Sequence, residues 1–173
     1  TLHYYLDGVD QGVASTDIAT GVYAVIDLYG QCAQVSMSTG TVVIPPADIL
    51  QQHVSLHTEQ ISTPSVVNTD ITHRLSKCCG KNITLRNSCW GASRIQSYNH
   101  GIVFSSEPLK YDEIFEVEIS EVSNQWSGSL KIGLTTIAIS DTSCPISIPS
   151  TADEITSKVT WIVSGSEVKK CGV

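Results

Sequence analysis

Several features are scarce in this sequence, and each scarcity excludes a class of protein. Only 16% of its 173 residues are charged, which is too few for a coiled coil, whereas 41% are hydrophobic, which is too many for a disordered tail. The longest apolar runs, such as Val42-Val43-Ile44, are far shorter than a membrane span. The length and composition therefore predict a folded region with room for a sizeable core and no membrane-spanning segment.

Basic residues are absent from the first part of the chain. Residues 1–73 contain seven acidic residues and no Lys or Arg, whereas residues 74–173 contain ten acidic and ten basic residues. The formal net charge of −7 leaves no basic patch for a phosphate backbone, so no nucleic-acid partner is expected. Such an asymmetry is also found in binding tails, but two segments of different structural origin explain it better.

The cysteines lack the spacing of a metal site. The sequence has no C-x-x-C pair, and the adjacent Cys78 and Cys79 cannot both reach one metal ion without strain. The five histidines do not complete a zinc or RING pattern with them, so no metal and no cofactor is expected. Without signs of a secreted protein, the six cysteines are expected to be free thiols.

Residues 1–37 show the alternation of a β-meander. Leu2, Tyr4 and Leu6 alternate with polar positions before an Asp7-Gly8 turn, and Val22 to Leu28 and Ala33 to Met37 alternate again. In the second of these stretches Asp27 is expected on the opposite, water-facing side. Residues 38–72 are rich in Ser, Thr, Gln, Val and Pro, hold no period for long, and are interpreted as a linker.

Strand patterning returns after the linker. The alternation is clearest where Phe115, Val117 and Ile119 are separated by glutamates, and a second apolar row runs from Trp126 to Leu134. Residues 140–157 are expected to form a loop. Many short strands with turn signals between them and no long helical pattern predict an all-β, antiparallel sandwich. The other strands are expected at 82–86, 92–96, 101–105 and 160–163.

Catalytic motifs are missing. The sequence has no G-x-S-x-G, no H-E-x-x-H and no phosphate-binding G-x-x-x-x-G-K-[ST]. A Cys89–His100 couple is conceivable as nucleophile and base, but a lone Cys and a lone His more often have structural roles. Asp112 and Glu113 are better explained as a solvated turn than as an acid–base pair. No enzymatic activity is expected.

Binding is the better-supported role. Tyr98, Asn99 and His100 lie with Gly101 in a turn between predicted strands, where an aromatic ring and two polar groups suit peptide recognition. The alternative is that Asn99 and Gly101 merely form the turn while Tyr98 packs beneath it. Trp126 is either a core anchor, which the pattern favours, or a rim contact for a ligand. These observations make Tyr98, Asn99, His100 and Trp126 the candidate binding residues.

Several long segments resemble the neuralized homology repeat. Two of them resemble its C-terminal strands, and the other five resemble, in order, its N-terminal two-thirds. The first two are GVDQGVA (8–14) and VYAVIDLYGQCAQVSM (22–37). The others are HRLSKCCGKNITL (73–85), SYNHGIVFSSEPL (97–109), FEVEI (115–119), WSGSLKIGLTT (126–136) and TWIVSGSEV (160–168).

The order of these segments implies an unusual domain organisation. The resemblance places residues 1–37 at the end of one repeat, residues 38–72 in a linker, and residues 73–173 at the start of the next repeat, as in the family's multi-repeat member. It implies a β-sandwich similar to SPRY domains, which are concanavalin-like jelly rolls. One hypothesis is that the two partial repeats complement each other, although such a permuted sandwich would still lack one strand. The alternative is that they are stable only within the full-length array or after pairing with another chain.

The resemblance also implies a function. Neuralized-type repeats bind short segments of client proteins, and the multi-repeat member is an adaptor that brings clients to ubiquitin ligase components in the cytoplasm and at centrioles. The expected role is therefore a protein-interaction module of such an adaptor. The alternatives are a fragment, without the RING, of a neuralized-type ubiquitin ligase, or a repeat with a purely structural role.

Overall fold

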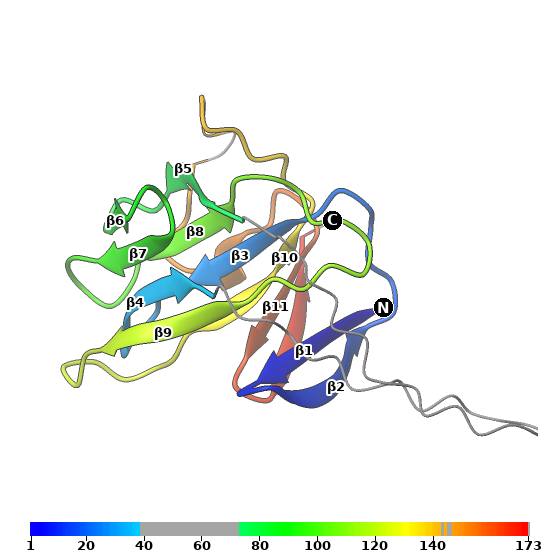
Figure 1. Cartoon of the computed structure of the whole chain (residues 1–173), viewed down its shortest axis with the longest axis horizontal. Helices are drawn as coiled ribbons and strands as arrows, with labels where there is room; N and C mark the ends of the chain where they lie inside the picture. The colour runs from blue at the N-terminus through cyan, green and yellow to red at the C-terminus, as the bar shows by residue number, and fades with distance from the viewer. Residues whose placement is uncertain (39–72, 143, 145–146, 173) are drawn as a thin grey trace, which may run out of the picture. The chain divides into compact units, whose positions relative to one another are not determined.

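The computed structural model describes residues 1–38, 73–142, 144 and 147–172, and nearly all of their regular secondary structure is β-strand (Figure 1). A 3-10 turn, η1, covers Ala152–Glu154. Within the part of the chain that the structure describes, no helix has both the length and the hydrophobicity that a membrane span requires. The strands, in chain order, are β1 (Leu2–Leu6), β2 (Val9–Ser15), β3 (Tyr23–Asp27), β4 (Cys32–Met37), β5 (Leu75–Cys79), β6 (Ile83–Arg86), β7 (Gly91–Arg94), β8 (Ile102–Ser105), β9 (Val117–Val122), β10 (Lys131–Thr135), β11 (Thr160–Ser164) and β12 (Glu167–Cys171).

The strands form two main antiparallel sheets and a separate hairpin. The six-stranded sheet has the order β12-β11-β10-β3-β8-β5, the four-stranded sheet has the order β6-β7-β4-β9, and β1 pairs with β2. The sheets form a β-sandwich, so the predicted all-β fold class is confirmed. Apart from Ser38, the expected linker lies outside the described residues.

Each main sheet takes an inner strand from the N-terminal segment. β3 pairs with β8 and β10, and β4 pairs with β7 and β9. The described parts on both sides of the expected linker belong to one compact unit. The strand pairing therefore shows that the two segments complement each other. Their assignment to two successive repeats stays a prediction.

The core has two layers because β3 is buried on both of its faces. Ile26 packs between the sheets with Val35 of β4 and Val103 of β8. Val25, on the opposite face of β3, packs against Ile155, because Ile137, Ile139 and the residues from 152 to 155 cover that face. The prediction that one side of β3 faces water is therefore wrong, because a stretch without periodicity covers that side.

Asp27 is fully buried by this cover, which corrects its predicted exposure. Its Oδ2 accepts hydrogen bonds from Thr151 Oγ1 at 3.0 Å and from the Ala152 amide at 2.9 Å. Burial raises the pKa of the carboxyl group, and these two hydrogen bonds act in the opposite direction. Asp27 thus ties η1 to the centre of the six-stranded sheet.

Two predicted strand boundaries are also corrected. The apolar row from Trp126 to Leu134 contains strand only from Lys131 onward, and Gly128, with a φ of +103°, lies in the loop before it. β9 covers Val117–Val122, so it begins two residues after Phe115, the first residue of the predicted alternation. β5 and β12 had no alternating pattern and were not predicted.

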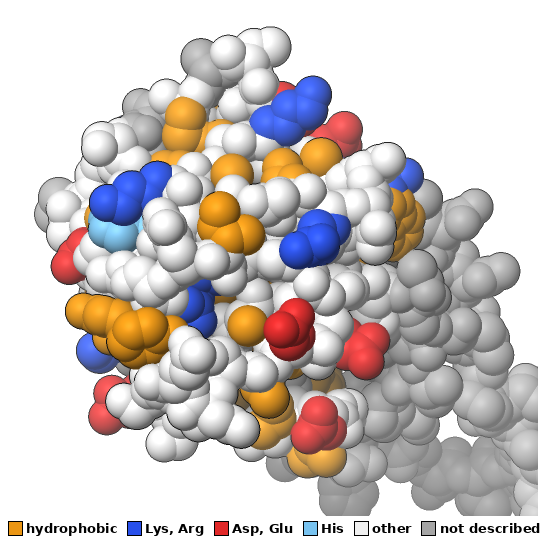
Figure 2. Space-filling view, turned by 90° about the vertical axis from the view of Figure 1, so that its left-hand side faces the viewer, with side chains coloured by type: hydrophobic (Ala, Val, Ile, Leu, Met, Phe, Trp, Pro, Cys, Tyr) orange, Lys and Arg blue, Asp and Glu red, His pale blue; other side chains and the backbone are white. Residues whose placement is uncertain are grey.

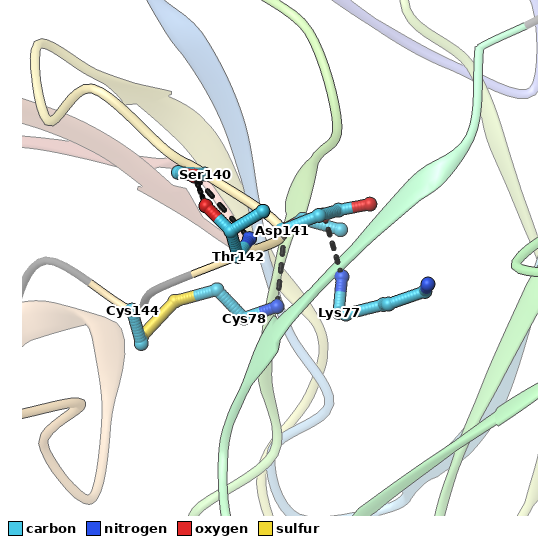
Figure 3. The surroundings of a disulfide bond; sticks show 7 residues. Lys77, Cys78, Ser140, Asp141, Thr142 and Cys144 are labelled. Atoms are coloured by element: carbon cyan, nitrogen blue, oxygen red, sulfur yellow. Dashed lines mark hydrogen bonds between the residues drawn. A yellow bond between two sulfur atoms is a disulfide. The ribbon is translucent and has the colours of Figure 1, made fainter.

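The expectation of six free thiols is wrong for two cysteines. Cys78 and Cys144 form a disulfide with their Cα atoms 5.0 Å apart, a separation that suits this bond (Figure 3). The loop that carries Cys144 is held beside β5 by Asp141, which accepts hydrogen bonds from Ser76 Oγ at 2.7 Å and from the Lys77 amide at 2.9 Å. A contact between positions 66 residues apart leaves no trace in sequence spacing.

We predict that loss of the disulfide destabilises the fold. Cys144→Ser should lower the free energy of unfolding by about 2–4 kcal/mol, because the cross-link restricts the unfolded chain. Urea denaturation without reductant measures the effect, and Cys171→Ser, which removes a free thiol, is the matched control. Equal midpoints for the wild type with and without dithiothreitol would contradict the prediction.

A second prediction concerns the pH dependence of the Asp141 contact. The hydrogen bond from Ser76 and, to a smaller extent, that from Lys77 lower the pKa of Asp141. Its contribution to stability is therefore present above the usual pKa of about 4 and is lost as pH falls through the lower pKa of the folded state. Asp141→Ala should cost about 1 kcal/mol at neutral pH.

Urea denaturation between pH 3 and 7 tests this dependence. The difference between the wild type and Asp141→Ala should shrink toward the acid end, whereas Glu107→Ala, at an exposed acid, should follow the wild type throughout. A difference that stays constant down to pH 3 would show that Asp141 does not act through its charge.

Candidate functional site

Three loops meet at one end of the sandwich, on the left of Figure 1. They are the β3–β4 turn (28–31), the β7–β8 loop (95–101) and the β9–β10 loop (123–130). The turn joins the other two through its backbone: Gly30 donates to the Tyr98 carbonyl at 2.9 Å, and Gln31 donates to the Gly128 carbonyl at 3.0 Å. A further bond runs from the Ser123 amide to the Gln31 carbonyl at 2.8 Å. The loops thus have fixed relative positions.

Two glycines permit this close approach. A Cβ atom at Gly30 would lie 2.3 Å from the Ser127 carbonyl oxygen, and one at Gly128 would lie 2.8 Å from the Tyr29 ring. Both residues also have positive φ angles, +58° and +103°, which glycine adopts without strain. Larger residues at either position would push the β3–β4 turn away from the β9–β10 loop.

Arg94, the last residue of β7, fixes the β3–β4 turn from within the protein. Its Nε donates to the Leu28 carbonyl at 2.7 Å, and its Nη2 donates to the carbonyls of Gly30 and Cys32. The side chain is buried, and burial lowers the pKa of its guanidinium. The planar fork of a guanidinium matches several carbonyl oxygens at once, which a lysine cannot reproduce.

The loops present three aromatic rings around a groove of about 210 Å³, here called the aromatic groove, lined by Tyr29, Tyr98, Trp126 and Ser127. The Tyr98 ring lies between the other two: its centroid is 5.8 Å from that of Tyr29, edge to face, and 5.5 Å from that of Trp126. Tyr98 is 41% exposed and Trp126 is 38% exposed. Figure 2, which faces this end of the molecule, shows hydrophobic side chains gathered at the surface.

The structure brings together two of the four predicted site residues. Tyr98 and Trp126 both line the aromatic groove, so Tyr98 does not pack beneath its turn and Trp126 is not a core anchor. Asn99 and His100 lie in the same loop and hold its backbone. The Asn99 carbonyl accepts from Asn82 Nδ2 at 2.9 Å, and the His100 amide donates to the Ser150 carbonyl at 2.7 Å.

Of the three aromatic residues that line the groove, Tyr29 is the one that sequence reasoning missed. It lies in the short break between two alternating strands, in the tetrad Leu28-Tyr29-Gly30-Gln31, where the glycine marks a turn. Lys131 Nζ lies 4.5 Å from the centroid of its ring, within the range of a cation–π contact. The break in alternation at this tetrad is the sequence signal that could have identified Tyr29 as a loop residue.

A charged network lies next to Tyr29. Lys131 Nζ donates to Thr151 Oγ1 at 2.7 Å and forms an ion pair with Asp153, and Thr151 in turn donates to Asp27. These contacts join β3, β10 and η1. The ammonium group of Lys131 thus interacts with Thr151, Asp153 and the Tyr29 ring. These contacts hold Tyr29 and η1 in place.

The groove has the chemistry of a binding site. It is smaller than the cavities of about 300–1,000 Å³ that hold small-molecule ligands, and its rings offer faces for one or two side chains of a bound segment. No cluster of three or more metal-ligating side chains occurs among the described residues. A second hollow, of about 270 Å³, lies within the 147–157 segment and has no aromatic lining.

We predict that the hydrogen bonds of Arg94 to the β3–β4 turn stabilise the fold. Arg94→Met should lower the free energy of unfolding by about 3 kcal/mol, because three carbonyls lose a charged donor, and Arg94→Lys should restore only part of this. Urea denaturation measures the change. The matched control is Lys81→Met just before β6, where the side chain is exposed; equal small losses for Arg94→Met and Lys81→Met would contradict the assigned role.

Comparison with known proteins gives a family and several partial relatives. The Neuralized family model matches residues 1–39 and 75–172. Neuralized-like protein 2 of Homo sapiens is 41% identical over 64 residues, which cover 37% of this chain and 22% of that protein, and the values are the same for its Mus musculus counterpart. Protein neuralized of Drosophila melanogaster is 34% identical over 56 residues, 32% of this chain and 7% of that protein.

The chain spans less than a quarter of the length of these curated relatives. No solved structure matches it. The family model, in contrast, covers both segments that build the two sheets, with the unmatched stretch falling between β4 and β5. Because that match extends over most of the sequence, the chain belongs to the Neuralized family.

Proposed function

We propose that this chain is a protein-interaction module whose aromatic groove binds a short segment of a client protein. The observation that carries the proposal is the exposure of Tyr98 and Trp126 beside Tyr29, in loops whose backbones are fixed by hydrogen bonds. Exposed aromatic rings on a rigid framework supply contact area at a low entropic cost and are frequent hot spots of interfaces. Groove residues on three different loops suit a linear segment that crosses them.

The client role rests on the family resemblance together with this groove. We propose that the bound protein is presented to ubiquitin ligase components in the cytoplasm, including at centrioles, by a multi-repeat neuralized-type adaptor. In this proposal the chain contributes recognition and the transfer of ubiquitin takes place elsewhere. A ligase subunit with a RING outside this chain is the alternative, and Cys and His residues of RING spacing elsewhere in the full-length protein would favour it.

Selection from a displayed library of random dodecapeptides tests groove binding. Peptides selected on the wild-type chain should bind with micromolar Kd, and Trp126→Ala should weaken them at least tenfold, since truncating an interface hot spot costs about 2 kcal/mol. Tyr111→Ala is the matched control, because Tyr111 is 83% exposed and lies outside the groove. Fluorescence anisotropy gives both affinities.

Two results would overturn the proposal. Selected peptides that bind Trp126→Ala and Tyr111→Ala equally would place recognition elsewhere on the chain. A selection that enriches no peptide above background would favour the purely structural role.

The adaptor step has its own readout: a reporter protein fused to a selected peptide should acquire ubiquitin in a cytoplasmic extract with the wild-type chain, and not with Trp126→Ala.

A further inference from the structure

One edge of the four-stranded sheet is open. β9 is the last strand in the order β6-β7-β4-β9, so one of its edges pairs with β4 and the other pairs with no strand of the described residues. An unpaired edge offers a row of backbone N–H and C=O groups to any extended chain that reaches it. This edge lies outside the set of residues that line the aromatic groove.

The inward face of β9 is apolar and incompletely covered. The register places three apolar residues opposite buried residues of β4: Val117 opposite Met37, Ile119 opposite Val35, and Val122 opposite Cys32. Nevertheless, Ile119 is 46% exposed and Val122 is 62% exposed. The inter-sheet core is therefore open to water at this edge.

The opposite sheet extends past this opening. The sandwich has four strands on one side and six on the other, and consecutive strands connect the sheets at β3–β4 and β5–β6. This connectivity sets β9 opposite β10, with β11 and β12 beyond it. Val168 of β12, in register with the buried Val163 of β11, is 38% exposed. β1 covers part of that face, because Leu2 packs against Leu134 and Trp161. One additional strand beside β9 would widen the smaller sheet and cover the exposed Ile119 and Val122.

The outward face of β9 is acidic. Glu118 lies opposite Ser36 and Glu121 lies opposite Gln34 on the solvent side, and Glu116 precedes the strand. Within the described part of the chain, none of these three carboxylates takes part in an ion pair. In Figure 2, acidic side chains lie close to exposed hydrophobic ones on the lower part of the molecule. A neighbouring strand with basic residues on its outward face would complement this row.

We propose that the free edge of β9 binds an extended segment of a partner protein as a fifth strand. The segment carries apolar side chains at every second position, which pack on Ile119 and Val122, and Lys or Arg at the positions between them, which lie beside Glu118 and Glu121. Backbone hydrogen bonds supply affinity and the alternation supplies specificity. Antiparallel pairing with a second copy through the same edge would oppose two acidic rows, so a basic partner fits better.

The interaction is tested with synthetic decapeptides that alternate valine with lysine or valine with glutamate. The Val/Lys peptide should bind the wild-type chain in low salt at least tenfold more tightly than the Val/Glu peptide. Glu118→Lys/Glu121→Lys should reverse this preference. The matched control is Glu107→Lys/Glu167→Lys, which changes the net charge equally at exposed acids outside β9 and should keep the wild-type preference.

Two further measurements separate strand addition from attraction of opposite charges. A Val/Lys peptide with N-methyl groups on alternate residues keeps its charge but loses backbone donors, and it should bind at least tenfold more weakly. Amide hydrogen exchange with the unmodified peptide should slow in residues 117–122. Circular dichroism establishes that each variant keeps its fold.

Four outcomes would overturn the proposal. They are equal binding by the two charge-reversal variants, undiminished binding of the N-methylated peptide, slowed exchange outside β9, and no binding of any peptide at millimolar concentration. Slowed exchange in β9 without peptide, together with a dimer in sedimentation, would assign the edge to a second copy. The aromatic groove is not part of this test, so either proposal can fail without the other.

Discussion

The insertion of β3 and β4 into two sheets made largely by the rest of the chain is the constraint on which this structure depends. β3 has a neighbour on both sides in the six-stranded sheet, and β4 has one on both sides in the four-stranded sheet. The turn between them is held by Arg94 from β7 and by backbone bonds from both neighbouring loops. Because this turn crosses from one sheet to the other, the same contacts close the sandwich and build the aromatic groove.

Much of the fold could be predicted because alternation reports burial on one face of a strand. It located β3 and β4 closely, since their apolar residues are spaced by two and bounded by turn residues. β8 was located instead as a short continuous apolar run. It failed where burial came from elsewhere. Asp27 is polar in an alternating strand, yet the aperiodic segment that follows β10 buries it and provides its hydrogen-bond donors. The Cys78–Cys144 pair likewise depends on the path of that segment.

The groove was predictable in part for a related reason. Tyr98 and Trp126 each stand in a recognisable turn context, so single-residue reasoning selected them. Their contact with each other and with Tyr29 depends on glycine positions that let three loops approach, which is a property of the assembled sheets. Asn99 and His100 have polar side chains of the kind that bind ligands, but their backbones carry the contacts that shape the loop.

Amide hydrogen exchange in the native state tests most directly whether the two segments form one sandwich. The account predicts that amides of β3, which belongs to the N-terminal segment, exchange with the same free energy of opening as those of β8 and β10, its partners. Rapid exchange throughout β3 while β8 and β10 remain protected would show that the N-terminal segment is not part of the sheet, and would contradict the account.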